Sequence, residues 1–157
     1  MKRHALVLCK SVHHGNTQLV ADRIASVLGA LVVDPEYAML PSAGALGLIG
    51  IGSGIYFGRF HKSIRVWLQS LPANAGEGHR AFVYSTSGLP FLSGIYHRPV
   101  RRGLEKKGFE VVGEFSCRGY DTYGALWLIG GLNRKHPDEQ DLLRAERFAE
   151  QLSHELS

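Results

Sequence analysis

The clearest chemical signal in the sequence is a short polar run between residues 10 and 17, which reads KSVHHGNT. It follows a continuously apolar segment and leads directly into a segment with helical spacing. Hydroxyl groups, a glycine and exposed amides at a helix start favour an anion, since the helix dipole attracts negative charge there. No residue of the run is acidic. We therefore expect an anion site, the alternative being that Asn16 or Thr17 only caps the helix.

Two further glycine-containing segments carry aromatic residues. The first runs from Gly52 to His61 (GSGIYFGRFH) and the second from Thr86 to Leu92 (TSGLPFL). Aromatic faces stack on flat rings, and glycines let backbone amides approach a ring's polar edge. Beside an anion site, the two segments suit a flat ring with a phosphate tail. Alternatively, the aromatic residues simply cover the end of a sheet; these are Tyr56, Phe57, Phe60 and Phe91.

Other phosphate and metal sites are excluded by spacing. The sequence has no GxxxxGK[ST] and no GxGxxG, because Gly50, Gly52 and Gly54 are wrongly spaced. A Cys-x5-Arg loop starting at Cys9 would need arginine where Gly15 stands. The adjacent His13 and His14 lack the i, i+4 spacing of zinc helices and a nearby carboxylate, even with His61 or His97 added, so we expect no metal.

The elements around these segments alternate between strand and helix. We expect apolar strands at 4–9, 31–33, 46–51, 80–85 and 110–116, and helices at 16–28 and 64–71, with two more opened by Pro99 and Pro137. This alternation predicts an α/β fold with a parallel sheet wrapped by helices, as one domain over residues 1–157. Five strands suit the order 2-1-3-4-5. Its ligand crevice lies at the carboxyl ends of the strands, at the switch point between strands one and three.

Together the three loops resemble those of the flavodoxin family over nearly the whole chain, and the literal match is Gly15-Asn16-Thr17. The resemblance implies a flavodoxin-like three-layer sandwich with flavin mononucleotide (FMN) as cofactor. It implies that Tyr56 or Phe57 stacks on one face of the flavin ring and Phe91 on the other. Phosphate-loop residues by this resemblance are Ser11, His13, His14, Gly15, Asn16 and Thr17. The two ring loops would contribute Gly54, Ile55, Tyr56, Phe57, Gly58, Thr86, Ser87, Gly88 and Phe91.

The chain also departs from the common pattern. It has one more residue between Ser11 and Gly15 than the usual Ser-x-Thr-Gly-Asn-Thr form. Residues 51–61 look like the same loop in quinone-dependent protoporphyrinogen oxidases, but that branch's long basic insertion after the fourth strand is absent. Residues 113–141 resemble uncharacterised flavodoxin-family proteins of bacteria and archaea. Three functions stay open: FMN-dependent electron transfer or reduction, a quinone-linked oxidase, and a binding module without flavin.

The net charge of the protein limits the classes of partner that we expect it to bind. The net charge is +4, the sequence pI is about 9.2, and cations gather between Arg98 and Lys107. An acidic redox partner, or a small-molecule or quinone acceptor, fits this balance, whereas the motifs of nucleic-acid binding are missing. No apolar stretch is long enough for a transmembrane helix or a signal peptide, so we expect a cytoplasmic protein. Two distant cysteines predict no disulfide framework.

The expected ring loops also contain no acidic residue from Ser53 to Arg59 or from Thr86 to His97. Changing one charge at about 6 Å from the flavin ring, with an effective dielectric of about 20, changes the energy of the charged, reduced flavin by roughly 3 kcal/mol. For one electron this corresponds to on the order of 100 mV. Low-potential flavodoxins resemble one another in having acidic residues around the flavin, and we call these acidic flavodoxins. We therefore expect the fully reduced flavin to form at a less negative potential here than in acidic flavodoxins. Residues 117–136 have no assigned role, although Tyr120, Asp121 and Tyr123 could line the cofactor edge.

Overall fold

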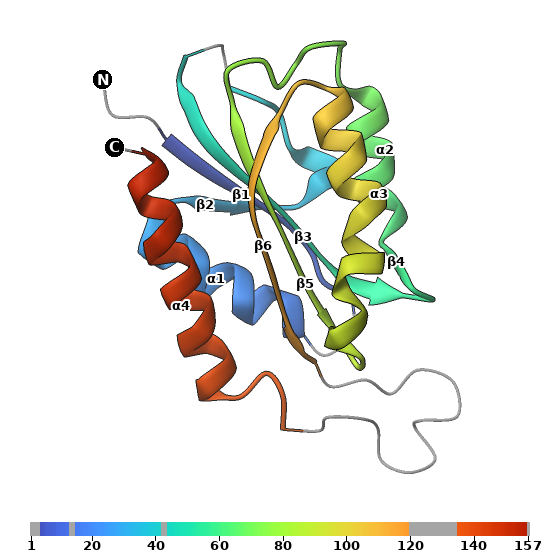
Figure 1. Ribbon diagram of the computed structural model, residues 1–157, viewed down its shortest axis with the longest axis vertical. Helices are drawn as coiled ribbons and strands as arrows, with labels where there is room; N and C mark the ends of the chain where they lie inside the picture. Colours follow the sequence, from blue (N-terminus) through green and yellow to red (C-terminus); the bar gives the residue numbers. More distant parts are fainter. Residues whose placement is uncertain (1–3, 13–14, 42–43, 120–134, 157) are drawn as a thin grey trace.

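The computed structural model describes residues 4–12, 15–41, 44–119 and 135–156. These residues form a sheet with helices packed on both of its faces (Figure 1). The strands are β1 (His4–Lys10), β2 (Leu31–Val33), β3 (Leu46–Tyr56), β4 (Arg59–Phe60), β5 (Arg80–Ser87) and β6 (Glu110–Arg118). The helices are α1 (Asn16–Leu28), α2 (Lys62–Ser70), α3 (Ser93–Lys106) and α4 (Glu139–Ser153), with the 3-10 turns η1 (Pro35–Tyr37), η2 (Pro90–Leu92) and η4 (His154–Leu156).

The strand order confirms the predicted topology. Five parallel strands follow the order β2-β1-β3-β5-β6, which is 2-1-3-4-5 when only the parallel strands are counted. The sheet has a sixth strand, β4, which pairs antiparallel with the end of β3 as a short hairpin. The five parallel strands are confirmed, and this hairpin adds one short strand that was not predicted. It went unrecognised because its residues resemble a glycine-rich loop.

Two hydrophobic clusters pack on opposite faces of the sheet. Helices α1 and α4 lie together on one face, and α2 and α3 on the other (Figure 1). On the α1–α4 face, Val7, Ile24 and Phe82 are fully buried. On the α2–α3 face, Leu8, Ile51 and Leu104 are fully buried. Because side chains of a strand alternate between its two faces, β1, β3 and β5 can be apolar along almost their whole length.

The glycines of β3 have a packing role. Gly50 lies opposite Phe82 of β5, and Gly52 lies opposite Tyr84. A Cβ atom at Gly50 would lie 2.2 Å from the Phe82 ring, and one at Gly52 would lie 1.9 Å from the Tyr84 ring. The two aromatic rings therefore occupy the space above the glycines, and the strand can contain no larger residue there.

Several predicted boundaries were wrong. Strand β3 continues five residues past Ile51, and β5 and β6 each continue two residues past their predicted ends, Ser85 and Ser116. Helix α3 begins at Ser93, so that Pro99 lies inside it and Pro90 instead opens the preceding turn. Helix α4 begins at Glu139 after Asp138, whose side chain caps it in a capping box with Asp141. A capping carboxylate marks this helix start better than Pro137 does.

Candidate functional site

The predicted site segments meet at one edge of the sheet. Lys10 at the end of β1 lies opposite Ser53 of β3, and Gly54 lies opposite Thr86 of β5. Because β1, β3 and β5 are parallel and adjacent, the segments that follow them leave the sheet on the same side. We call this region, together with the start of α1, the switch-point edge. Its position agrees with the rule that ligands of open α/β sheets bind outside the carboxyl ends of the strands.

Gly15 caps the start of α1. Its φ of 65° lies in the left-handed region, and its carbonyl accepts the first helical bond from Leu19 N at 3.1 Å. Asn16 and Thr17 are already inside the helix, so the idea that one of them is the N-cap was wrong. A glycine cap has no side chain to bond the first amides, and the first turn has no acidic residue. The start of α1 therefore keeps the electrostatic character that attracts an anion.

Three buried hydroxyl groups lie at the switch-point edge, two of them in contact at the start of α1. Thr17 is 1% exposed, and its Oγ1 lies 2.8 Å from Oγ1 of Thr86, which is also buried. Ser87, the last residue of β5, is buried as well, and its Oγ has no hydrogen-bond partner among the described residues. Buried hydroxyls are normally satisfied, so an orphan at a ligand edge suggests a missing partner. Asn16 and Thr86 pack against Gly119, which could carry no Cβ without crowding them.

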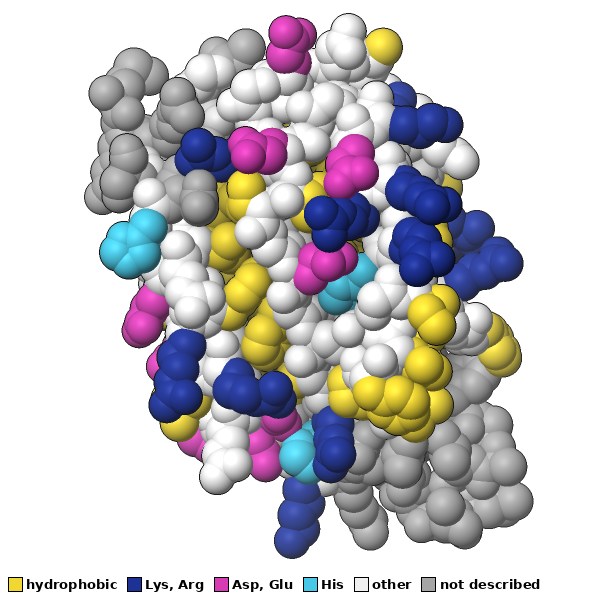
Figure 2. All heavy atoms as spheres, viewed as in Figure 1, with side chains coloured by type: hydrophobic (Ala, Val, Ile, Leu, Met, Phe, Trp, Pro, Cys, Tyr) yellow, Lys and Arg dark blue, Asp and Glu magenta, His cyan; other side chains and the backbone are white. Residues whose placement is uncertain are grey.

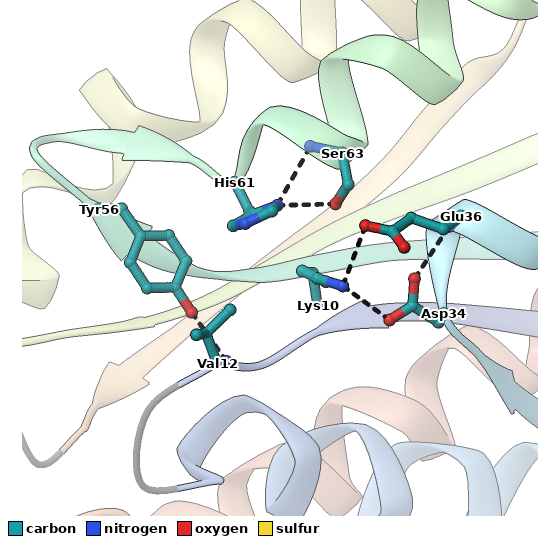
Figure 3. Close-up of polar contacts among 7 residues, drawn as sticks. All are labelled: Lys10, Val12, Asp34, Glu36, Tyr56, His61 and Ser63. Atoms are coloured by element: carbon teal, nitrogen blue, oxygen red, sulfur yellow. Dashed lines mark hydrogen bonds and ion pairs between the residues drawn. The ribbon is translucent and has the colours of Figure 1, made fainter.

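Tyr56 joins two of the segments (Figure 3). Its hydroxyl accepts a hydrogen bond from Val12 N at 3.0 Å, and its ring meets His61 edge-on with 5.6 Å between ring centroids. Burial raises the pKa of the Tyr56 phenol. The same hydroxyl would lie 2.8 Å from a Cβ at Gly54. Tyr56 thus lies across Gly54 and ties the end of β3 to the segment between β1 and α1.

The end of β3 is a strand rather than the expected loop. Gly54, Ile55 and Tyr56 are its last residues, and Ile55 pairs with Phe60 of β4. The turn itself is Phe57-Gly58, with φ values of 51° and 75°. Positive φ at both central residues is typical of the tight hairpin turn whose twist matches that of its strands. Phenylalanine tolerates such a φ poorly, so Phe57 stores strain at this place.

Large aromatic side chains border the switch-point edge on two sides. Phe57 at the hairpin turn is 80% exposed and Phe91 in η2 is 78% exposed. They belong to the two segments that were predicted to flank a flat ring. Two such faces turned to water on neighbouring loops are characteristic of a binding surface. Thr86 and Ser87, expected in the second of these loops, are the end of β5 instead.

Lys10 forms ion pairs with two acidic side chains. Its Nζ lies 3.0 Å from Asp34 and 3.4 Å from Glu36 (Figure 3). Burial alone would raise the pKa of Asp34, but the bond from Glu36 N and the one from Lys10 outweigh burial and lower it. The Lys10 charge is therefore neutralised. Among the described residues, backbone amides and hydroxyl groups are what the start of α1 offers to an anion.

The structure adds a buried polar chain that sequence reasoning missed. His97 is 2% exposed in α3, with Nε2 2.6 Å from Ser85 Oγ and Nδ1 3.5 Å from Glu114. Burial lowers the pKa of His97, and Glu114 partly opposes this. A neutral ring with Nδ1–H toward Glu114 and Nε2 accepting from Ser85 satisfies all three groups. His97 was expected near a loop because α3 was predicted to open only at Pro99.

The remaining candidates lie elsewhere. Ser11 is half-buried before the helix start. His13 and His14 lie outside the described residues, as do Tyr120, Asp121 and Tyr123. Among the residues that the structure does describe, His136, Asp138 and Asp141 have metal-like spacing. The Asp141 carboxylate is already bonded to His136 and Arg144, both at 2.6 Å, and to Asp138 N. The capping box explains this cluster without a metal.

Comparison with solved structures defines the class of fold. A flavodoxin from the domain Archaea matches with a TM-score of 0.72 and 14% identity over 98% of both chains. Flavodoxin 1 from Bacillus cereus matches with a TM-score of 0.70 and 16% identity over 99% of both chains. Rubredoxin oxygen:oxidoreductase from Desulfovibrio gigas matches 99% of this chain with 37% of its own, with a TM-score of 0.68 and 11% identity. The chain has a flavodoxin-like fold.

A curated relative places the chain in a family. The uncharacterized protein MJ0298 of Methanocaldococcus jannaschii is 44% identical over 148 residues, which cover 94% of this chain and 97% of that protein. The chain therefore belongs to the same protein family as MJ0298. No family model matches the sequence. In the described part of the chain, no helix is both long enough and apolar enough to cross a bilayer.

Proposed function

We propose that this protein binds FMN at the switch-point edge and works as a redox protein, in electron transfer or as a flavin-dependent reductase. The observation that carries the proposal is the start of α1. There a glycine cap in the left-handed conformation, a helix N-terminus and two buried threonine hydroxyls meet at one point. This arrangement suits a monophosphate.

The pair of threonine hydroxyls, Thr17 and Thr86, can donate one further hydrogen bond. In the contact between Thr17 and Thr86, one hydroxyl donates to the other. Each hydroxyl has one hydrogen, so the accepting hydroxyl keeps its hydrogen for another acceptor. A phosphate oxygen above the first turn of α1 is such an acceptor. The amides of Asn16 and Thr17, at the start of the helix, would donate to the same group.

The flat part of the cofactor fits the rest of the edge. Phe57 and Phe91 offer exposed aromatic faces on the two flanking segments. The Ser87 hydroxyl, which has no partner among the described residues, would offer a polar contact at the end of β5. Gly58 and Gly88 would let backbone amides approach the ring's polar atoms. Tyr56 would form the inner wall, since its hydroxyl already accepts a hydrogen bond from Val12 N. When bound, FMN supplies reversible one- or two-electron redox chemistry.

Charge around the edge supports a role unlike that of an acidic flavodoxin. Arg59 lies in the β3–β4 hairpin that carries Phe57 and Lys62 follows this hairpin, which has no acidic residue. Positive charge favours the reduced, anionic form of a flavin. We propose that the redox partner is acidic or is a small molecule, and that the protein works in the cytoplasm.

Affinity for flavins of different phosphate content tests the proposal. Apoprotein is titrated with FMN, riboflavin and FAD, following absorbance near 450 nm and flavin fluorescence. We expect FMN to bind at least about 100-fold more tightly than riboflavin, because the phosphate contributes several charge-assisted bonds. In Thr17→Val this preference should fall by about tenfold while riboflavin affinity stays constant.

Ser70→Ala is the matched control, because it removes a hydroxyl that bonds Trp67 O at the far end of α2. It should leave both affinities unchanged. A protein that binds no flavin would instead be a module that has the fold without the cofactor. Equal affinity for FMN and riboflavin would mean that the start of α1 does not hold the phosphate.

A further inference from the structure

The hairpin that carries Phe57 borders a basic hollow. The hollow has a volume of about 520 Å³ and lies between β4 and the start of α2. Its charged lining consists of Arg59, Lys62 and Arg65, with His61 beside them and no acidic residue. Lys62 and Arg65 are three residues apart on α2 and so share a face of the helix. We call this hollow the β4–α2 hollow.

These three cations have no acidic partner among the described residues. The described salt bridges that involve lysine or arginine belong instead to Lys10, Arg23, Arg80, Arg101 and Arg144. In the described part of the chain these five cations are neutralised by acidic neighbours, whereas those of the β4–α2 hollow are not. Burial, helped by Lys10 and Lys62, lowers the pKa of His61, whose Nδ1 accepts from Ser63 N in the cap of α2. His61 is therefore a neutral wall, and the net charge of the hollow comes from the three cations.

An apolar groove continues from the hollow. It has a volume of about 360 Å³ and lies between α2 and α3, which run side by side (Figure 1). Arg59, Phe60 and Arg65 line both the hollow and the groove. The rest of the groove is mainly apolar; its lining includes Leu68, Tyr96, Pro99, Val100 and Gly103. Gly103 sets its depth, because a Cβ there would lie 3.1 Å from Leu68 Cδ1.

The surroundings reinforce the charge of this region. Figure 2 shows Lys and Arg side chains gathered on the side of the molecule where α3 lies, with an apolar cluster below them. Exposed residues of α3 and its preceding turn include Phe91 and Ile95 at the apolar end and Arg98 and Arg102 further along. A long-range field of one sign concentrates anions near a cleft.

We propose that the β4–α2 hollow and the α2–α3 groove together bind a small organic anion with an apolar body. The anionic group lies among Arg59, Lys62 and Arg65, and the apolar body lies along Leu68, Tyr96 and Val100. The site is concave and within the size range of small-molecule pockets, which favours a small ligand over the flatter surface of a protein partner.

This site deepens the proposed function, on which its role depends. The hollow includes Tyr56 and Phe57 in its lining, so an anion bound there lies beside the residues assigned to the flavin ring. The small-molecule partner of the redox protein is then an amphipathic anion. Binding of the anion, however, needs only residues of this chain and can be measured with or without flavin.

A pair of probes separates charge from shape. Naphthalene-2-sulfonate and the uncharged 2-naphthylmethanol have the same aromatic body, and their binding is measured by titration calorimetry on FMN-treated and untreated protein. We expect the sulfonate to bind at least about tenfold more tightly than the alcohol, and this advantage to shrink as salt is raised. Arg59→Ala and Arg65→Ala should each remove most of the advantage, which is measured as the ratio of the two affinities in each variant.

Arg102→Ala is the matched control, because Arg102 is an exposed cation of α3 outside both linings. It should keep the advantage of the sulfonate nearly intact. Circular dichroism and thermal unfolding of every variant establish that folding is unchanged, as expected for exposed residues. Equal affinity for the two probes, no binding of either, or equal losses in Arg65→Ala and Arg102→Ala would overturn the proposed site.

The FMN titration is performed on the same samples and separates the two proposals. Sulfonate binding that depends on Arg59 and Arg65 in a protein that binds no FMN would retain this site and reject the flavin function. Tight FMN binding without any preference for the sulfonate would reject this site and retain the flavin function.

Discussion

The ring of Tyr84 in β5 lies directly over Gly52, its register partner in β3. The Tyr84 hydroxyl reaches past this glycine to the carbonyl of Leu8 in β1, 2.7 Å away. One side chain therefore spans three adjacent strands beneath the switch-point edge. The glycine of the middle strand is what lets the aromatic ring pass.

Gly52→Ala should destabilise the protein by about 3 kcal/mol or more, because the added Cβ would overlap a fully buried ring that cannot move aside. Gly94→Ala is the control, because a Cβ there meets nothing within 4 Å and should leave the stability nearly unchanged. Urea unfolding of both variants measures the free energies of unfolding. A Gly52→Ala variant as stable as the wild type would refute this packing.

Both cysteines should be unreactive while the protein is folded. Burial raises the pKa of the Cys9 thiol to about 12 and that of Cys117 to about 12. The reactive thiolate at pH 8 is then roughly a thousandfold scarcer than for an ordinary cysteine. Labelling with a thiol reagent should therefore be very slow in buffer and complete for both residues in denaturant. Rapid labelling of the folded protein would contradict their burial.

His97 should make the folded state lose stability in mild acid. Its pKa is lowered by burial, so the folded protein keeps it neutral while the unfolded chain takes up a proton below about pH 6.5. Its contribution is complete above that pH and declines as the pH falls toward the folded pKa. The stability difference between wild type and His97→Gln should therefore shrink between pH 7.5 and pH 5.

The control for His97 is His154→Gln, which changes an exposed histidine. Because the side chain is exposed, this substitution should change the free energy of unfolding at pH 7.5 by less than about 0.5 kcal/mol. If the difference between wild type and His97→Gln stays constant across this range, His97 is not held neutral by its surroundings, and the chain from Ser85 to Glu114 needs another explanation.

The reduction potential of the bound flavin should be less negative than in acidic flavodoxins. Arg59→Gln should make the two-electron midpoint potential more negative by on the order of tens of millivolts, because an exposed charge acts through a high effective dielectric. Arg147→Gln on α4, which covers the opposite face of the sheet, is the control. Redox titration with a dye of known potential measures the midpoint potential of both variants and of the wild type. Equal shifts would mean that Arg59 does not act on the ring.

Much of the fold could be predicted because its signals are local. Helix α1 and strand β2 have the predicted boundaries, since Gly15 and Gly29 bracket the helix and Asp34-Pro35 ends the strand. The strand order followed from the alternation of elements. Strand β3 was harder, because its glycines resemble a loop unless the facing Phe82 and Tyr84, about thirty residues away, are known.

In the candidate site, too, some contacts could be predicted from the sequence and others could not. Gly15, Thr17 and Thr86 meet where the loops of a parallel sheet were expected to meet. His97 contacts Ser85 and Glu114, which belong to two other elements, and no sequence motif predicts these contacts. The cations of the β4–α2 hollow are ordinary surface residues in sequence. Only the fold reveals that they line one cavity without an acid.

Amide chemical shifts of isotope-labelled apoprotein on addition of FMN, compared with inorganic phosphate, test the central claim most directly. The account predicts that phosphate alone shifts the amides of Gly15, Asn16 and Thr17. FMN should shift these and also Phe57, Gly58 and Gly88. Shifts confined to other parts of the sheet, or none at millimolar FMN, would contradict a flavin site at the switch-point edge.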